Sequence, residues 1–255
     1  MHFIKNLFFN IIFFMEAIGW LFFDLGSTLI DESEVIKSRC DYAIKEKKLN
    51  RDEFMAKVCE MAETSATAIL AVAESYGVTL PPWNNNLEKL YPETPAVLEK
   101  LAQKYKLGII ANQVEGTQKR IDNWGIGKYF DVVVASAEAG VAKPDSAIFK
   151  IALEKSGCKP ENAAMIGDRL DNDIIPAKKL GMKTIWVRQA LAVYQKVRND
   201  EEQPDFTIDS IREITEVLLK KIRILRNRNN TSETTGSKVV LPYVPGCPVC
   251  GGQYI

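Results

Sequence analysis

Short apolar runs alternate with amphipathic segments along most of this chain. An uninterrupted apolar run of about four to eight residues is typical of a strand buried on both faces of a sheet, whereas apolar residues recurring every three or four positions indicate a helix. Strands are predicted at 20–23, 106–111, 131–135, 163–167 and 182–187. Helices are predicted at 94–105, at 114–124, from the capping residue Asp145 to Gly157, from the capping residue Asp173 to Gly181, and at 208–225. This order predicts an α/β fold with a Rossmann-like parallel sheet of about five strands and helices on both faces.

Residues 32–90 differ in composition from the rest of the chain. They are rich in Glu, Lys and Ala, and their apolar positions have helical spacing, which predicts three or four helices and no strand. We interpret this segment as a small helical cap domain, inserted into a core domain formed by residues 15–31 and 91–225.

The first 23 residues are strongly apolar, and three interpretations of this stretch, which includes residues 1–14, compete. A transmembrane helix needs about 20 apolar residues, but Asn10 and Glu16 interrupt the run. A signal peptide would end in a small-residue cleavage site, and none follows. We favour an apolar extension upstream of a natural start at Met15, and we rank a membrane-associated N-terminal helix next.

Residues 226–255 are predicted to be a flexible tail, because their composition turns polar before a short end that carries Cys247 and Cys250. A structural zinc ion needs four ligands, and this CxxC motif supplies two. We therefore interpret the motif as a pair of thiols, with a zinc ion shared between two chains as the alternative.

Charge and residue usage exclude several classes of function. Lys+Arg and Asp+Glu each number 33, so no net charge attracts nucleic acid or an anionic membrane. The one histidine is His2, which argues against histidine-based catalysis. Cys40, Cys59 and Cys158 are isolated, as is typical of reduced thiols in a cytoplasmic protein. We expect a cytoplasmic protein without a stable membrane span; the apolar N-terminal stretch leaves membrane association open, and a homodimer also stays open.

Polar side chains follow four of the predicted strands. Asp24 follows the first strand, Asn112 the second, Lys143 lies before the helix after the third, and Asp168 and Asp173 follow the fourth. Ligands of open parallel sheets bind at the carboxyl ends of the strands, so these groups should converge. Carboxylates that lie together need a cation, and hard oxygen ligands suit Mg²⁺. A carboxylate, a metal ion and a lysine together form a site for phosphoryl transfer.

The order and spacing of these residues resemble the haloacid dehalogenase (HAD) superfamily across residues 18–217. That family has a strand ending in Asp-x-Asp-Gly-Thr, a strand ending in Ser or Thr, a Lys often followed by Pro-Asp, and a Gly-Asp with a second Asp five residues after the first. The corresponding segments here are Asp24-Leu25-Gly26-Ser27-Thr28, Ala111-Asn112, Lys143-Pro144-Asp145, and Asp168 with Asp173. The predicted helical insert resembles the cap domain of the family.

The resemblance implies a role for each matched residue. Asp24 is the nucleophile and forms an aspartyl intermediate. Magnesium is held by Asp24, the backbone carbonyl of Gly26 and Asp168. Asp173 orients the waters of the metal or Lys143, and Lys143 offsets charge on the phosphate and the nucleophile.

Phosphate binding at the second motif involves the first departure from the family. Asn112 is expected to offer its backbone N–H to the phosphate, but Ala111 lacks the hydroxyl that the family has at this position. Losing such a hydrogen bond costs about 1–3 kcal/mol. Gln113 is a candidate replacement.

The second departure is Gly26, at the position where the family carries its general acid/base. Such help is worth about 10²–10⁴ in rate, and glycine cannot supply it. This favours a leaving group that needs no proton, such as that of an acyl or aryl phosphate. Otherwise the acid comes from elsewhere, with Asp31, Glu32 or a cap residue as candidates.

We expect a magnesium-dependent phosphatase that acts through an aspartyl phosphate on a small phosphorylated metabolite, with cap residues selecting the substrate. One alternative is a non-catalytic or weakly catalytic protein that binds a phosphorylated ligand, and another is a hydrolase of C–P or C–halogen bonds. The dehalogenase branch of the family uses no Mg²⁺ and lacks the acidic loop found here, so Asp168, Asp171 and Asp173 argue for a metal and against that branch.

Arg169 and Asp171 themselves are interpreted as solvated loop residues, with Arg169 also a candidate substrate contact. The tryptophans are expected in cores or at the cap hinge, namely Trp83, Trp124 and Trp186.

Overall fold

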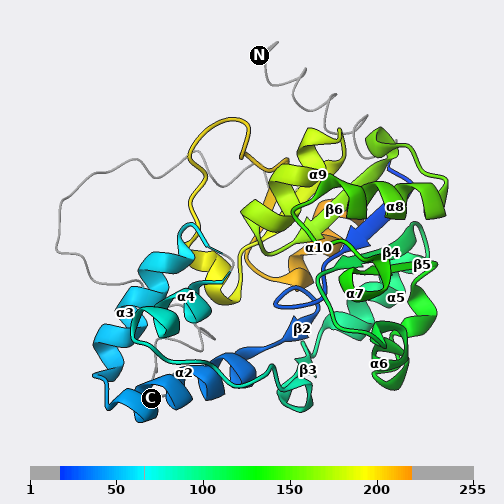
Figure 1. Ribbon diagram of the computed structural model, residues 1–255. Coiled ribbons are helices and arrows are strands. Elements are labelled where there is room, and N and C mark those ends of the chain that lie inside the picture. The colour runs from blue at the N-terminus through cyan, green and yellow to red at the C-terminus, as the bar shows by residue number, and fades with distance from the viewer. Residues whose placement is uncertain (1–17, 66, 220–255) are drawn as a thin grey trace.

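The computed structural model describes residues 18–65 and 67–219. Its centre is a six-stranded parallel sheet in the order β5-β4-β1-β6-β7-β8 (Figure 1). The strands are β1 (Trp20–Phe23), β4 (Lys106–Ala111), β5 (Val132–Ala135), β6 (Ala163–Gly167), β7 (Lys183–Val187) and β8 (Phe206–Ile208). The predicted α/β class is confirmed, and β1 lies in the middle of the sheet between β4 and β6.

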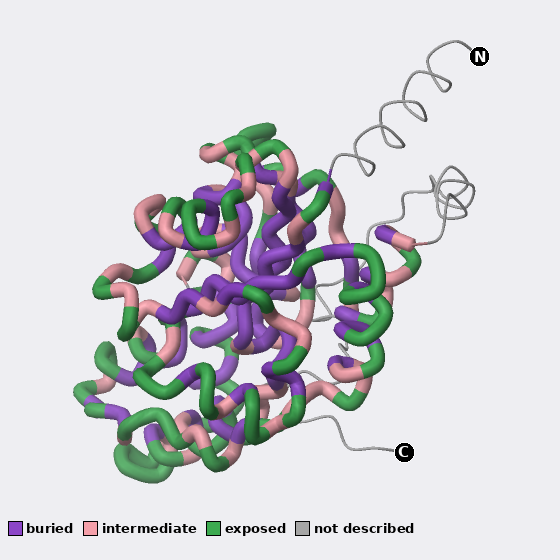
Figure 2. Tube along the Cα trace, turned by 90° about the vertical axis from the view of Figure 1, so that its right-hand side faces the viewer, coloured by how far each residue is buried: buried purple, intermediate pink, exposed green. Residues whose placement is uncertain are grey.

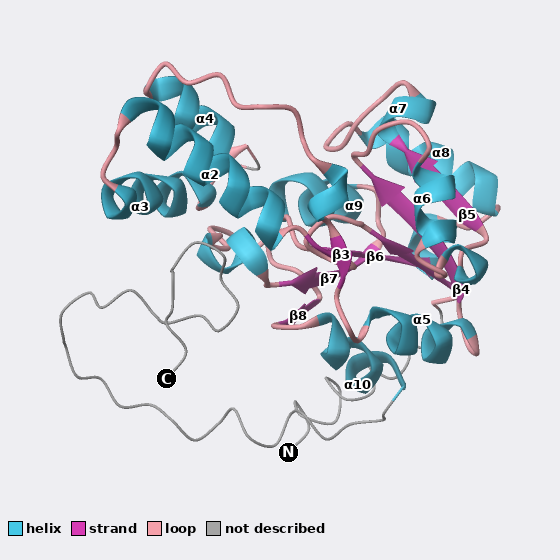
Figure 3. Cartoon of the chain, turned by 90° about the horizontal axis from the view of Figure 1, so that it is seen from below, coloured by secondary structure: helices cyan, strands magenta, loops and turns pink. Residues whose placement is uncertain are grey.

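Helices cover both faces of this sheet. Figure 3 shows α5 (Thr94–Ala102) and α10 (Ile214–Leu219) against one face, and α8 (Ser146–Ser156) and α9 (Ile175–Lys179) against the other. The remaining short elements are the helices α6 (Thr117–Asn123) and α7 (Ser136–Ala139) and the 3₁₀ turns Asn85–Leu87, Gly127–Tyr129, Pro160–Asn162, Ala190–Tyr194 and Ile211–Glu213.

Alternation along β1 divides the core into two layers. Leu21 and Phe23 belong to the apolar cluster beneath α5, whereas Phe22 belongs to the cluster beneath α8, because successive strand residues point to opposite faces. All three are fully buried. Figure 2 shows the resulting buried interior, with exposed residues on the outer helices and loops. The carboxyl end of β1 is therefore fixed by packing on both sides.

The sixth strand corrects the prediction of a helix that begins at Ile208. Ile208 ends β8, and α10 begins only at Ile214. β8 pairs with β7 in register, and Asp205 reinforces this edge by accepting hydrogen bonds from the backbone N–H and the hydroxyl of Thr184. Three residues are too few for a periodic signal, so pairing with a neighbour decides this strand.

Asp173 does not cap a helix as predicted. It lies within a π-helical turn (Leu170–Ile174), and α9 begins at Ile175, with Pro176 in its first turn. The Asp173 carboxylate instead accepts a hydrogen bond of 2.9 Å from the backbone N–H of Arg169. Asp145 does cap α8, by accepting a bond of 2.9 Å from the backbone N–H of Ala147.

The segment predicted as a helical insert contains three helices, α2 (Ser33–Lys47), α3 (Arg51–Ala62) and α4 (Ala68–Ser75), which pack around a separate apolar cluster that Leu191 of the Ala190–Tyr194 turn also joins. The expectation of no strand was wrong, because β2 (Ile30–Asp31) and β3 (Lys89–Leu90) form a two-stranded antiparallel sheet at the base of this helical insert. Each strand has two residues, and their pairing joins segments about sixty residues apart in the chain, so no local pattern indicates it.

Several predictions fall on residues outside the described ranges: the apolar extension at 1–14, the tail at 226–255 with Cys247 and Cys250, and the last part of the helix predicted to reach 225. Within the described ranges, no helix combines the length and the apolar character that crossing a bilayer requires. The domain boundaries, the cytoplasmic location and the homodimer stay predictions.

Candidate active site

Asp24 is the first residue after β1 and lies in the middle of the sheet edge. Its backbone N–H donates a 2.8 Å hydrogen bond to the carbonyl of Ile166 in β6, which continues the sheet pairing by one residue. Its side chain is only 11% exposed. The sheet therefore holds this carboxylate in a defined position at the carboxyl edge, where open parallel sheets bind ligands.

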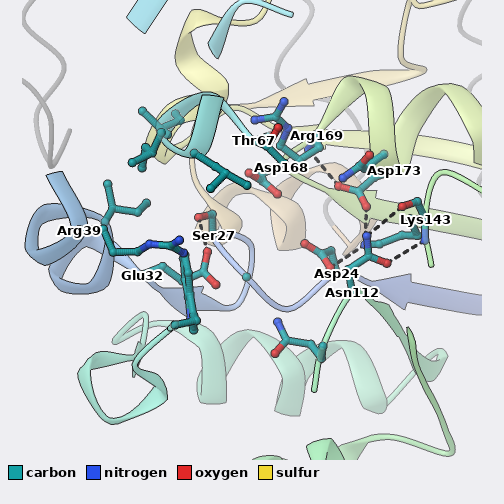
Figure 4. Close-up of a pocket in the computed structure, with 18 residues that line it drawn as sticks. Asp24, Ser27, Glu32, Arg39, Thr67, Asn112, Lys143, Asp168, Arg169 and Asp173 are labelled. Carbon is teal, nitrogen blue, oxygen red and sulfur yellow. Dashed lines mark hydrogen bonds and ion pairs between the residues drawn. The ribbon is translucent and has the colours of Figure 1, made fainter. Parts of the chain in front are cut away.

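Lys143 connects Asp24 to Asp173. Its Nζ lies 2.6 Å from Oδ1 of Asp24 and 2.6 Å from Oδ1 of Asp173, and its side chain is 2% exposed (Figure 4). Burial alone would lower the pKa of Lys143, but Asp173 and Asp24 outweigh burial and raise the pKa above its ordinary value. The ammonium therefore stays charged between the two carboxylates.

The side chain of Asn112 fixes the backbone of Lys143. Its Nδ2 donates to the Lys143 carbonyl at 2.9 Å, and its Oδ1 accepts from the Lys143 N–H at 2.7 Å. The sequence had suggested the backbone N–H of Asn112 as a phosphate ligand. The structure adds this pair of side-chain hydrogen bonds, called the clamp below, which could not be predicted because the two residues are 31 positions apart in the chain.

Replacing Asn112 by alanine (Asn112→Ala) removes both bonds of the clamp. We expect the free energy of unfolding to fall by about 1–3 kcal/mol, because backbone groups of Lys143 lose their partners in a half-buried place. Urea unfolding measures the change. Asn123→Ala, at the exposed end of α6, is the control and should stay within about 0.5 kcal/mol of the unchanged protein. Equal stabilities of the two variants would contradict the clamp.

Asp168 follows β6 and completes a cluster of three buried carboxylates. One oxygen each of Asp24, Asp168 and Asp173 lies within 4.8 Å of the others. The backbone carbonyl of Asp168 accepts a 2.7 Å hydrogen bond from Nε1 of Trp186, a tryptophan that is buried as expected. The sequence positions of these acids at strand ends predicted that they would meet.

This cluster carries more negative charge than Lys143 can balance. Burial and then the charges of Asp173 and Asp24 raise the pKa of Asp168 well above its usual range. Burial and the charge of Asp24 also raise the pKa of Asp173, to about 6, against the opposing effect of Lys143. An unbalanced set of hard oxygen donors with a small separation fits a magnesium ion, which would stabilise the charged carboxylates.

The loop after Asp24 has two unusual residues. Gly26 has no side chain, and a Cβ built on it would lie 2.5 Å from Oε1 of Glu32. Ser27 has a φ of 53°, a left-handed conformation that costs a non-glycine residue about 1–3 kcal/mol. Its Oγ donates a 2.8 Å hydrogen bond to Oε2 of Glu32. Burial, opposed by the Ser27 bond and reinforced by Asp24 and Glu88, raises the pKa of Glu32 to about 8.

A cavity of about 310 Å³ opens above these residues, between the sheet edge and the helical insert (Figure 4). The sheet side contributes the charged groups described above, and the insert contributes Arg39, Thr67, Leu70 and Trp83. The Arg39 guanidinium lies 5.3 Å from the centre of the Trp83 ring, and Nε1 of Trp83 donates to Glu88 at 2.8 Å. The sequence gave no signal for Arg39, because one arginine on a charged helix has no distinguishing pattern.

The structure bears on three expectations about individual residues. Trp83 does not lie in a core but is 38% exposed at the cavity, so the core is excluded for it and the expected alternative, the cap hinge, stays a prediction. Arg169 is not a solvated loop residue: it is 9% exposed, pairs with Asp171 at 3.1 Å and lines the cavity. The oxygen of the Gln113 side chain is engaged by Arg120, so its replacement of the hydroxyl missing at Ala111 stays a prediction.

Comparisons with known proteins agree with this geometry. Residues 21–187 match the family model described as haloacid dehalogenase-like hydrolase. A glyceraldehyde 3-phosphate phosphatase of Methanopyrus kandleri is 38% identical over 132 residues, which are 51% of this chain and 57% of the relative's length. The matched part thus spans little more than half of that relative. A glyceraldehyde 3-phosphate phosphatase of Pyrococcus furiosus is 28% identical over 80% of this chain and 94% of its own length.

Solved structures show the same fold. A HAD phosphatase from Thermococcus onnurineus has a TM-score of 0.55 at 22% identity, with 80% of this chain and all of that chain covered. A magnesium-bound HAD-hydrolase from Bacillus subtilis has a TM-score of 0.58 at 20% identity, with 79% and 99% covered. With the family model matching about two thirds of the chain and the acidic cluster in place, the protein belongs to the haloacid dehalogenase-like hydrolase family.

Proposed function

We propose that this protein is a magnesium-dependent phosphatase that hydrolyses small phosphorylated metabolites through an aspartyl phosphate, the acyl phosphate formed on the Asp24 carboxylate. The observation that carries the proposal is the buried Asp24 carboxylate, held 2.6 Å from the Lys143 ammonium inside a cluster of three acids. The names of the relatives, which are phosphatases of glyceraldehyde 3-phosphate, phosphoserine and phosphoglycolate, support the same class of substrate.

In this proposal Asp24 attacks the phosphorus in line, and the bond from phosphorus to the leaving oxygen breaks as the new bond forms. A water molecule then attacks the phosphorus and releases inorganic phosphate and free Asp24. Lys143 stays beside Asp24 throughout and offsets the negative charge of the phosphoryl group. Asp173 holds Lys143 in place through its 2.6 Å contact.

Asp24, Asp168 and the backbone carbonyl of Gly26 would hold the magnesium ion, and Asp173 would orient the waters of the ion or Lys143. When bound, the ion supplies positive charge to the phosphoryl oxygens as they gain charge. Asn112 and Ala111 lie at the end of β4, where the backbone N–H of Asn112 is the proposed phosphate contact.

Substrate selection is assigned to the helical insert, acting as the cap. Ligand pockets commonly measure about 300–1,000 Å³, so this cavity is at the small end and suits a small metabolite. Arg39 and Trp83 face the cavity from the insert and offer a cation and an aromatic surface to the part of the substrate beyond its phosphate.

A phosphate-release screen with Mg²⁺ tests the proposal. It spans acyl, aryl, sugar and nucleotide phosphates, and the Asp24→Asn protein serves as the blank. Release above the blank on at least one small substrate is the expected result. A beryllofluoride adduct on Asp24 without turnover of any substrate would point to ligand binding instead, and halide release without Mg²⁺ would point to a dehalogenase.

Removal of the metal provides a separate prediction. We expect excess EDTA to stop turnover and added Mg²⁺ to restore it, because the three acids would then lose the cation that their cluster is proposed to hold. Phosphate release before and after restoration is the measurement, and EDTA saturated beforehand with Mg²⁺ is the control. Turnover that persists in EDTA contradicts the magnesium assignment.

A further inference from the structure

Breaking an alkyl phosphate leaves a strongly basic oxygen, which needs a proton as its bond to phosphorus breaks. A positioned acid is worth about 10²–10⁴ in rate. Gly26, close to the nucleophile in the chain, carries no acidic group, so the sequence alone suggested substrates whose leaving groups need no proton. The structure places another carboxyl group at this point.

The carboxyl of Glu32 occupies the space that a side chain on residue 26 would fill. A Cβ on Gly26 would lie 2.5 Å from Oε1, 2.9 Å from Cδ and 2.9 Å from Oε2 of Glu32. A side chain at position 26 and the observed position of Glu32 therefore exclude each other. The absence of a side chain at Gly26 and the presence of the Glu32 carboxyl are two parts of one arrangement.

Ser27 holds the Glu32 carboxyl in this place. Its hydroxyl donates a 2.8 Å hydrogen bond to Oε2 (Figure 4), although its φ of 53° would suit glycine better. Glycine at position 27 would relieve the backbone and lose this bond. The chain thus carries a strained residue whose side chain contacts Glu32.

Glu32 differs from the other carboxylates that line the cavity. Asp24, Asp168 and Asp173 also line it, but they form the cluster around Lys143. Asp31, the neighbouring candidate from the sequence, accepts a bond from the backbone N–H of Ser33 and is not among the residues that line the cavity. In the described part of the chain, Glu32 is the carboxyl group that faces the cavity outside that cluster.

We propose that Glu32 is the acid/base residue of this site and that Ser27 is its positioning residue; this inference rests on the proposed phosphatase function. Glu32 gives its proton to the leaving oxygen while the bond from Asp24 to phosphorus forms. The resulting Glu32 carboxylate then takes a proton from the water that attacks the aspartyl phosphate, which restores both groups. Alkyl phosphates thereby fall within the substrate range.

The test compares two substrates in the Glu32→Gln protein. One is the alkyl phosphate with the highest kcat/KM in the release screen, and the other is p-nitrophenyl phosphate, whose leaving group departs without a proton. We expect kcat/KM to fall by about 10²–10⁴ for the alkyl phosphate and by less than about 10-fold for p-nitrophenyl phosphate. We also expect a burst of one nitrophenolate per protein, because the second step still lacks its base. Equal losses on both substrates, or no loss on either, would overturn the proposal.

A double variant tests whether a carboxyl group at this place is sufficient, whichever residue carries it. Glu32→Ala removes the carboxyl, and adding Gly26→Asp returns one to nearly the same place, since the space at residue 26 is then free. We expect the double variant to recover at least about 10-fold in alkyl-phosphate kcat/KM over Glu32→Ala. No recovery in a double variant that still binds beryllofluoride at Asp24 counts against the proposal.

Ser27→Gly tests the positioning role with two readouts that move in opposite directions. We expect a more stable protein, because glycine suits the left-handed backbone, but a loss of alkyl-phosphate turnover that p-nitrophenyl phosphate does not share. Wild-type selectivity in this variant would overturn the role of Ser27.

The release screen separates failure of this inference from failure of the phosphatase proposal. If aryl and acyl phosphates are hydrolysed but no alkyl phosphate is, the role of Glu32 is overturned, whereas the role of Asp24 as the nucleophile still holds. No turnover of any phosphate would overturn the phosphatase proposal first.

Discussion

The Asp24→Asn protein is expected to release phosphate at least about 10⁴-fold more slowly than the unchanged protein, because an amide cannot form the aspartyl phosphate. The amide oxygen can still accept the hydrogen bond from Lys143, so the local geometry should survive. Single-turnover phosphate release with Mg²⁺ measures the loss. Activity within about 100-fold of the unchanged protein would contradict the nucleophile.

A measurement of stability shows whether the lost activity of Asp24→Asn comes from the missing nucleophile or from an unfolded protein. Asp24→Asn removes one of three close negative charges, and the charge of Asp24 raises the pKa of both Asp168 and Asp173. We therefore expect the metal-free variant to be at least as stable as the unchanged protein in urea. Asp145→Asn is the matched control, because Asp145 is exposed and caps α8, a role that asparagine fills equally well. It should keep both activity and stability.

The Lys143→Met protein is expected to lose about 3–5 kcal/mol in free energy of unfolding in EDTA, because the buried Asp24 and Asp173 lose their cation. It should also lose at least about 10²-fold in kcat, since charge on the phosphoryl group is no longer offset. Urea unfolding and phosphate release measure the two effects. Lys106→Met is the control: Lys106 pairs with Asp131 at 2.7 Å but is 64% exposed, so its loss should cost less than about 1 kcal/mol. Similar costs for both variants contradict the buried ion pair.

The cost of Lys143→Met should grow with pH. The folded-state pKa of Asp173 is already raised to about 6, and removal of Lys143 raises it further. An acid with a raised folded-state pKa binds more protons in the folded than in the unfolded state, so its charged form destabilises the fold. Stability is therefore lost as pH rises from the unfolded pKa, about 4, through the folded value. Unfolding at pH 5 and pH 8 in EDTA should show the larger cost at pH 8.

Much of the fold and the site follows from sequence pattern. The apolar runs at 20–23, 106–111 and 163–167 are long enough and uniform enough to indicate buried strands, and the structure confirms them. Once their parallel order is accepted, the residues after their carboxyl ends must meet at one edge of the sheet. This is why Asp24, Lys143 and Asp168 could be placed together although 119 residues separate Asp24 from Lys143.

Tertiary structure decided the features that depend on contacts between distant or very short segments. The two-residue pair Ile30–Asp31 and Lys89–Leu90, and the edge strand Phe206–Ile208, are too short to carry a periodic signal, so their partners determine them. Arg39 and Trp83 reach the cavity only because the helical insert folds over the sheet edge.

Gly26 shows the difference most clearly. By itself the sequence determined that position 26 has no acid, because the residue type is visible in the chain. Only the tertiary structure decided that the carboxyl of Glu32 fills the empty volume, with Ser27 bonded to it. The physical reason is that a sequence specifies which groups exist, whereas the path of the backbone through this loop specifies which space each group occupies.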